Sequence, residues 1–165
     1  MYNNPGTTKF TFSPDLIARL AEQPNVTAVK MPLPSDGGFA GEMRRLRAVT
    51  PERFAIGHSG DWGAKDALLA GAACWYSVVA GLLPEPAALT RAAQQGTAAE
   101  AERINQAFAP LWALFREFGS FRVIFAIAEI LGFGGITPPR PILPLDQARH
   151  KRVEVALQPL LQVTV

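Results

Sequence analysis

Lys30 is the first residue whose type and setting could support chemistry. It stands near the end of the apolar segment 26–31. An amine that is desolvated by apolar neighbours loses its proton more readily and can attack a carbonyl carbon to form an imine. A lysine at a strand end can equally extend its amine into solvent, with its stem along the apolar surface. The segment alone leaves both interpretations open.

Tyr2 is the second such residue, and it begins the sequence Tyr-Asn-Asn-Pro-Gly-Thr-Thr at residues 2–8. A tyrosine at a strand end, followed by a Pro/Gly turn, can place its hydroxyl beside a reacting carbonyl as a proton carrier. The alternative is an aromatic side chain at a frayed terminus.

Three short apolar segments predict the buried strands that would position these residues. They cover residues 26–31, 54–58 and 74–79, and residues 1–2 form a possible further stub. Turn residues bound the segments, and helical patterns separate them. Strands that alternate with helices at this spacing are typical of a parallel sheet.

Helical patterns fill most of the remaining chain, and the first begins at a cap signature in which Ser13 precedes Pro14. The connection at residues 137–144 is too rich in proline for regular structure, and Pro159 should interrupt the last helix. The expected helices cover residues 14–20, 39–49, 61–70, 84–95, 97–118 and 121–133, and a final one starts after residue 146.

The count of strands predicts an α/β fold with about half of a parallel barrel. A closed (β/α)8 barrel has eight strands and typically about 250 residues. We therefore expect a half-barrel domain at residues 1–95 and a helical extension of three helices at residues 96–165. The inner face of such an open sheet should need a cover.

Composition excludes several classes of protein. The chain has 165 residues, 48% of them hydrophobic, with 16 basic and 14 acidic residues and no basic run, which argues against nucleic-acid binding. There is no apolar run of membrane-spanning length and no leader pattern, so we expect a soluble cytoplasmic protein. The single cysteine argues against a disulfide framework and a cysteine-rich zinc site.

A second group, His58, Ser59 and Asp61, invites comparison with a Ser/His/Asp triad. The three are almost adjacent, so their side chains diverge along a strand and loop, and no nucleophile-elbow pattern surrounds the serine. A triad is therefore not expected. His58 is kept only as a residue that could line a pocket.

Three motifs, taken together, resemble those of the dihydrodipicolinate synthase/N-acetylneuraminate lyase family. They are Tyr-Asn-x-Pro at residues 2–5, Lys30, and Ser-Gly-Asp at residues 59–61. Residues 71–78 and the Arg-Pro-x-x-Pro motif at residues 140–144 resemble the family's last strand and C-terminal connection. The resemblance covers only the family's C-terminal half, which would correspond to about strands 5–8 of a TIM barrel.

The resemblance implies a lyase, aldolase or dehydratase that uses a lysine imine and no cofactor. Lys30 would form a Schiff base with pyruvate or a related small 2-oxo acid, and Tyr2 would transfer protons. Gly60, Tyr76 and Thr7 would contact the substrate. The family also implies a homo-oligomer.

The sequence departs from the family at several positions. Thr7 stands where synthases that use an aspartate-derived semialdehyde have an arginine, and Trp62 begins the pair that is acidic in sialic acid lyases. A less familiar 2-oxo-acid lyase is therefore expected. The family's carboxylate-binding Thr-Thr pair precedes the tyrosine, whereas residues 7–8 follow it, so we expect a truncated or split reading frame or a deliberately shortened form. The alternative function is a non-catalytic half-barrel that self-associates or docks to a partner chain.

Overall fold

The computed structural model describes residues 1–161, which form two compact units. The first unit contains residues 1–77 and 92–98, and the second contains residues 78–91 and the chain from residue 99 onward. None of the described helices is both long enough and apolar enough to cross a membrane.

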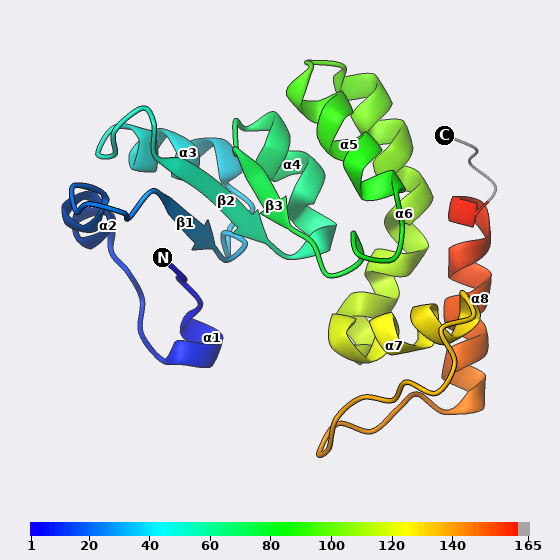
Figure 1. Cartoon of the computed structure of the whole chain (residues 1–165). Helices are drawn as coiled ribbons and strands as arrows, with labels where there is room; N and C mark the ends of the chain where they lie inside the picture. The colour runs from blue at the N-terminus through cyan, green and yellow to red at the C-terminus, as the bar shows by residue number, and fades with distance from the viewer. Residues whose placement is uncertain (162–165) are drawn as a thin grey trace. The chain divides into compact units, whose positions relative to one another are not determined.

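A three-stranded parallel sheet is the centre of the first unit (Figure 1). Its strands are β1 (Ala28–Met31), β2 (Ala55–Ser59) and β3 (Cys74–Tyr76), in the order β1-β2-β3. All pairs are parallel, and a parallel bridge joins residue 2 to residue 30 on the outer side of β1. The three strands and the stub expected from the sequence are therefore present.

The third strand is shorter than the sequence predicted, because it ends at Tyr76 and not at residue 79. The next residue, Ser77, donates a hydrogen bond from its hydroxyl to the carboxylate of Asp61 at 2.7 Å. This side-chain bond connects the loop after β3 to the loop after β2. The hydrophobic pattern continued past Tyr76, but the strand pairing did not.

Helices cover one face of the sheet (Figure 1), and that face holds the apolar core of the unit. They are α2 (Pro14–Ala21), α3 (Phe39–Arg47) and α4 (Ala64–Leu69), and a single 3-10 turn, η1 (Asp61–Gly63), leads into α4. The helix α2 packs on α3, and α4 packs on β2 and β3. The core side chains are Ile17, Ala21, Val29, Met31, Phe39, Met43, Leu46, Phe54, Ile56, Ala67 and Ala72.

The start of α2 follows the predicted cap. The Ser13 side chain accepts a hydrogen bond from the amide of Leu16 at 3.2 Å, and Pro14 occupies the first helical position. A short helix that the sequence did not predict, α1 (Pro5–Thr8), precedes it and ends at Lys9 with a left-handed φ of 57°. Four residues are too few for a hydrophobic period to be visible.

The second unit consists of helices. They are α5 (Glu85–Gln94), α6 (Ala98–Phe118), α7 (Ser120–Ile130) and α8 (Gln147–Leu161). The last three residues of α5 and the first residue of α6 belong to the first unit. The helix α7 packs against α8. The expected interruption at Pro159 is wrong, because α8 continues to Leu161. A proline so close to a helix end removes only one backbone hydrogen bond.

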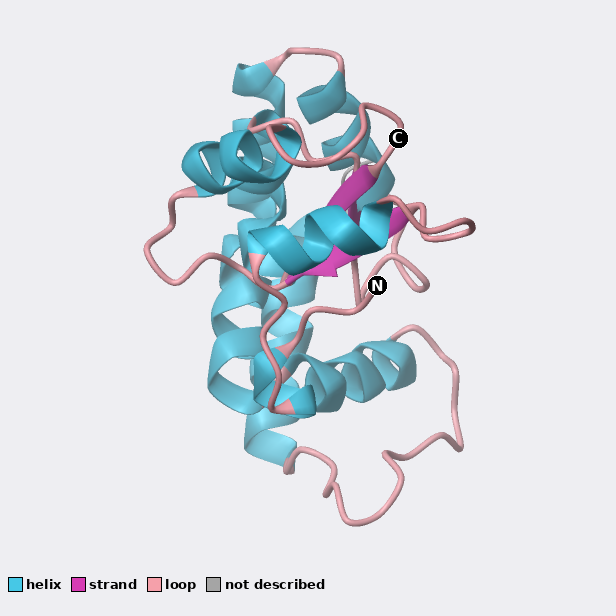
Figure 2. Ribbon diagram, turned by 90° about the vertical axis from the view of Figure 1, so that its left-hand side faces the viewer, coloured by secondary structure: helices cyan, strands magenta, loops and turns pink. Residues whose placement is uncertain are grey.

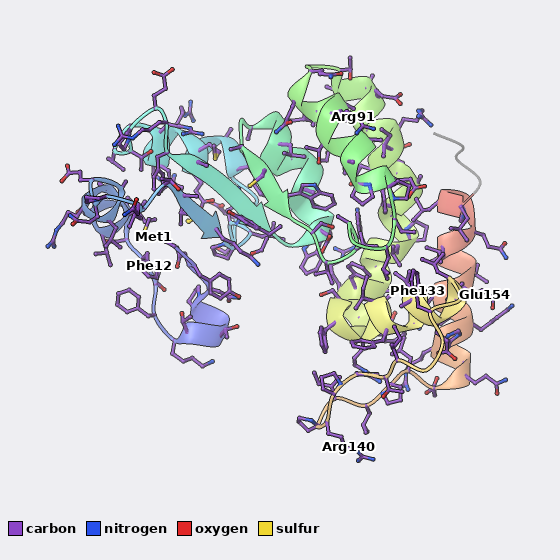
Figure 3. All side chains as sticks on the ribbon, in the orientation of Figure 1. Met1, Phe12, Arg91, Phe133, Arg140 and Glu154 are labelled. Carbon is purple, nitrogen blue, oxygen red and sulfur yellow. The ribbon has the colours of Figure 1, made fainter. Side chains whose placement is uncertain are left out.

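A long connection between α7 and α8 contains no helix or strand, as the proline-rich sequence predicted (Figure 2). Arg140 lies far out along it (Figure 3). The Arg122 side chain holds its later part by donating to the carbonyl oxygens of Leu143 at 2.8 Å and Pro144 at 3.1 Å.

Candidate active site

Two tyrosine rings lie close to the amine of Lys30. Its Nζ is 5.1 Å from the ring centroid of Tyr2 and 5.2 Å from that of Tyr76, and it lies over both rings. An aromatic face attracts a cation at such distances. The structure therefore brings together three of the five residues expected at the site, namely Lys30, Tyr2 and Tyr76. They come from opposite edges of the sheet.

The backbone of β1 fixes Tyr2 beside Lys30. The Lys30 amide donates to the carbonyl of Met1 at 2.9 Å, and the Asn3 amide donates to the carbonyl of Lys30 at 2.9 Å. The terminal amine of Met1, which lies next to β1 in Figure 3, donates to the carbonyl of Ala28 at 2.6 Å. Residues 1–3 thus extend the sheet by one short strand-like segment, which keeps the tyrosine in register.

The buried side chain of Asn3, the residue after Tyr2, bonds to the backbone of Phe12. It is 3% exposed, and its side-chain oxygen accepts from the amide of Phe12 at 3.2 Å, while its amide group donates to the Phe12 carbonyl at 3.4 Å. These two bonds close the segment that contains α1 (Figure 3 labels Phe12). The neighbouring Asn4 side chain donates to the hydroxyl of Tyr2.

Gly57 makes room for the second ring. It is the register partner of Lys30 on one side and of Cys74 on the other. A Cβ at Gly57 would lie 2.6 Å from the Cys74 sulfur and 2.8 Å from Cε2 of Tyr76, and Cβ atoms in proteins do not come this close to non-bonded neighbours. Burial raises the pKa of the Tyr76 hydroxyl, and Cys74 raises it further.

The other two expected residues are placed differently. Gly60 directly follows β2 and has a φ of +92°. A Cβ there would lie 2.7 Å from the Leu33 side chain, so this turn requires glycine. Thr7 is exposed on α1, and its side chain makes no hydrogen bond within residues 1–161 that would connect it to Lys30. The expected contact between Thr7 and a substrate stays a prediction.

Sequence reasoning missed a buried pair on the opposite face of the sheet. His58 is 1% exposed, and its Nε2 lies 2.7 Å from Oε2 of Glu42 on α3. The His58 ring also makes an edge contact with Phe39, at 5.4 Å between centroids. The sequence carried part of this signal. Residues 39 and 42, which both contact His58, are three apart and therefore lie on the same side of the predicted helix.

A cavity of about 440 Å³ lies on this helix side of β1. Its walls include Met31 and Glu42 but not Lys30. Since successive side chains of a strand point to opposite faces, the cavity and the amine are separated by β1 itself. The cavity therefore does not belong to the group around Lys30.

Comparison with known proteins identifies relatives of this chain. The model of the dihydrodipicolinate synthetase family matches residues 1–160. A 4-hydroxy-tetrahydrodipicolinate synthase of Synechococcus elongatus is 36% identical over 147 residues, which are 87% of this chain and 47% of the relative. One from Methanospirillum hungatei is 35% identical over 157 residues, which are 93% of this chain and 51% of the relative.

Solved structures agree with the sequence comparison. The crystal structure of a dihydrodipicolinate synthase from Agrobacterium tumefaciens is 60% identical, with a TM-score of 0.93 over 96% of this chain and 54% of that one. A putative dihydrodipicolinate synthetase from Pseudomonas aeruginosa is 27% identical, with a TM-score of 0.85 over 96% of this chain and 54% of that one. The chain thus spans about half the length of the relatives it matches. Since the family model extends over nearly all of its residues, the chain belongs to the dihydrodipicolinate synthetase family.

Proposed function

We propose that Lys30 forms an imine with the keto carbon of pyruvate or a related small 2-oxo acid, and that Tyr2 transfers the protons. The observation that carries this proposal is the amine itself, which lies about equally far from two tyrosine rings, at 5.1 Å and 5.2 Å. Membership of the family supports it, because the relatives named above are synthases of the aldolase type.

Imine formation at Lys30 would release one molecule of water. The neutral amine adds to the carbonyl carbon, and the resulting hydroxyl leaves as water after it receives a proton. The Tyr2 hydroxyl, which accepts a hydrogen bond from Asn4, is proposed to relay that proton. The protonated imine then withdraws electrons, so that a proton or a carbon substituent can leave the adjacent carbon. Gly60 and Tyr76 are proposed to border the substrate.

A second candidate function rests on the exposure of the sheet face that carries Lys30. Tyr2 is 42% exposed and Tyr76 is 37% exposed, and Lys30 is only half-buried between them. Parallel sheets are usually covered on both faces. This favours the alternative of a non-catalytic half-barrel whose open face is covered by another copy or a partner chain. Sedimentation of the purified chain, which gives its mass in solution, would detect self-association.

The test of the imine is chemical trapping. The full chain is incubated with pyruvate and borohydride, which reduces an imine to a stable amine, so that the modified lysine gains the mass of pyruvic acid less one oxygen atom. We expect the gain at Lys30 and its loss in Lys30→Arg. The Tyr2→Phe variant should be labelled about 10²-fold more slowly, since general acid–base catalysis contributes at least that much.

Two internal references make the result decisive. Lys9 and Lys151 are exposed, so they report the reactivity of an ordinary lysine amine in the same sample. If Lys30 is labelled no faster than these two, the proposed function is wrong. A single sedimenting species with more than one copy, together with an unreactive Lys30, would favour the non-catalytic alternative.

A further inference from the structure

The two rings at the amine have different origins. Tyr2 comes from the segment beside β1, whereas Tyr76 is the last residue of β3, on the far side of β2. Its ring reaches Lys30 across β2, because residue 57 has no side chain in the space between them. The second wall of the amine site therefore depends on a glycine in the middle strand.

We propose that Tyr76 sets the size of the carbonyl compound that reaches Lys30, and that it admits small unbranched compounds and excludes those branched beside the carbonyl. For 2-oxo acids the inference rests on the proposed function, since it assumes that they are the compounds that react there. The steric part concerns the amine alone and holds for any carbonyl compound.

The distances define the available width. Carbon atoms in van der Waals contact are about 3.5–4.0 Å apart. With Nζ at 5.1 Å and 5.2 Å from the two centroids, the amine lies only about 1.1–1.7 Å beyond contact with either ring. A flat, unbranched group bonded to Nζ needs little space beside either ring. A quaternary carbon beside the imine has methyl groups in several directions, so it should meet the ring of Tyr2 or Tyr76.

Neighbouring residues restrict the position of the Tyr76 side chain. Its ring lies over Gly57, where an added Cβ would come within 2.8 Å of Cε2, and Cys74 precedes it by two residues on the same face of β3. The side chain of Ser77, the following residue, bonds to the buried Asp61. Contacts from its own strand, from the neighbouring strand β2 and from the loop after β3 therefore restrict the movement of this ring away from the amine.

Reductive alkylation tests the steric part without any 2-oxo acid. The full chain is treated with cyanoborohydride and either formaldehyde or 2,2-dimethylpropanal, and modification at Lys30, Lys9 and Lys151 is measured by peptide mass spectrometry. We expect the ratio of small to bulky modification at Lys30 to exceed that at the two exposed lysines by at least about 10-fold, the scale on which a shaped pocket discriminates small differences.

Two variants at one position separate the ring from its hydroxyl. Tyr76→Ala should bring the ratio at Lys30 down to that of the exposed lysines, while Tyr76→Phe should keep it. Because Tyr76 is 37% exposed, neither change leaves a closed cavity in the core, and circular dichroism confirms that each variant is folded. An unaltered ratio in Tyr76→Ala, or a wild-type ratio equal to that of Lys9, overturns the proposal.

The matching arm uses pyruvate and 3-methyl-2-oxobutanoate with borohydride. Lys30 of the wild-type chain should trap the first at least about 10-fold better than the second, and Tyr76→Ala should lose this preference. If the aldehydes are discriminated but neither 2-oxo acid is trapped, the proposed function fails while the steric role of Tyr76 stands. If both 2-oxo acids are trapped equally, the size limit fails while the imine chemistry stands.

Discussion

Removal of the Glu42 carboxylate should destabilise the first unit, because it leaves a buried imidazole without a partner. His58 is 1% exposed, and Glu42, itself 16% exposed, provides the contact at 2.7 Å to its Nε2. The other ring nitrogen, Nδ1, has no hydrogen-bond partner among residues 1–161. In Glu42→Ala neither nitrogen would be bonded to protein.

The expected magnitude follows from this geometry. A buried polar group that loses its partner costs about 1–3 kcal/mol, and bonds to charged groups lie toward the upper end of that range. Glu42→Gln retains a neutral hydrogen-bonding group of the same length. Since charge-assisted bonds are roughly twice as strong as neutral ones, Glu42→Gln should lose about half as much as Glu42→Ala.

The assay must report on the unit that contains the pair, because two compact units can unfold separately. Hydrogen exchange of the β2 amides provides this, since their protection follows the local free energy of opening. Arg44→Ala is the matched control, because Arg44 is exposed on the same helix and should change stability by less than about 0.5 kcal/mol. The reasoning is refuted if Glu42→Ala and Arg44→Ala lower β2 protection equally.

Three smaller changes should also have measurable effects. Ser13→Ala removes the N-cap of α2 and should cost about 0.5–2 kcal/mol, measured by denaturant unfolding. Asn3→Ala removes both side-chain bonds to Phe12, so the amide of Phe12 should exchange faster, whereas unchanged exchange would contradict the assigned role. Glu117 has a lowered pKa because Arg152 donates hydrogen bonds to it, so its contribution to stability is present above the ordinary glutamate pKa and is lost as pH falls through the folded-state pKa. The difference in melting temperature between wild type and Glu117→Gln should therefore vanish at low pH and shrink in high salt.

The sequence predicted the elements better than their ends. Residues of the three strands were identified from apolar runs bounded by turns, and the cap at Ser13 was identified from residue types alone, because both signals are local. The third strand was predicted too long, since Val78 and Val79 continue the apolar pattern. Where the pairing stops depends on contacts after Tyr76, such as the bond between Ser77 and Asp61, which no local pattern reveals.

The site was predictable only in part for the same reason. Lys30 and Tyr2 were identified from their strand and motif, and the structure brings them together. The seating of the Tyr76 ring over Gly57 needs the register of three strands, which a sequence pattern does not give. Thr7 was expected to contact the substrate on the basis of the motif alone, and this stays a prediction. The four-residue helix on which it lies was not predicted from the sequence.

The alternation of side chains assigns separate tasks to the two faces of this sheet. On β1, Lys30 faces the tyrosine rings, while Met31, the next residue, is buried under the helices. On β2, Gly57 leaves space on the first face, while His58 is bound to α3 on the second. Since no residue contributes its side chain to both faces, the contacts that stabilise the unit differ from those that shape the amine site. A shift of one residue in the register of β2 would therefore disrupt both at once, because it would exchange glycine for histidine beside the amine.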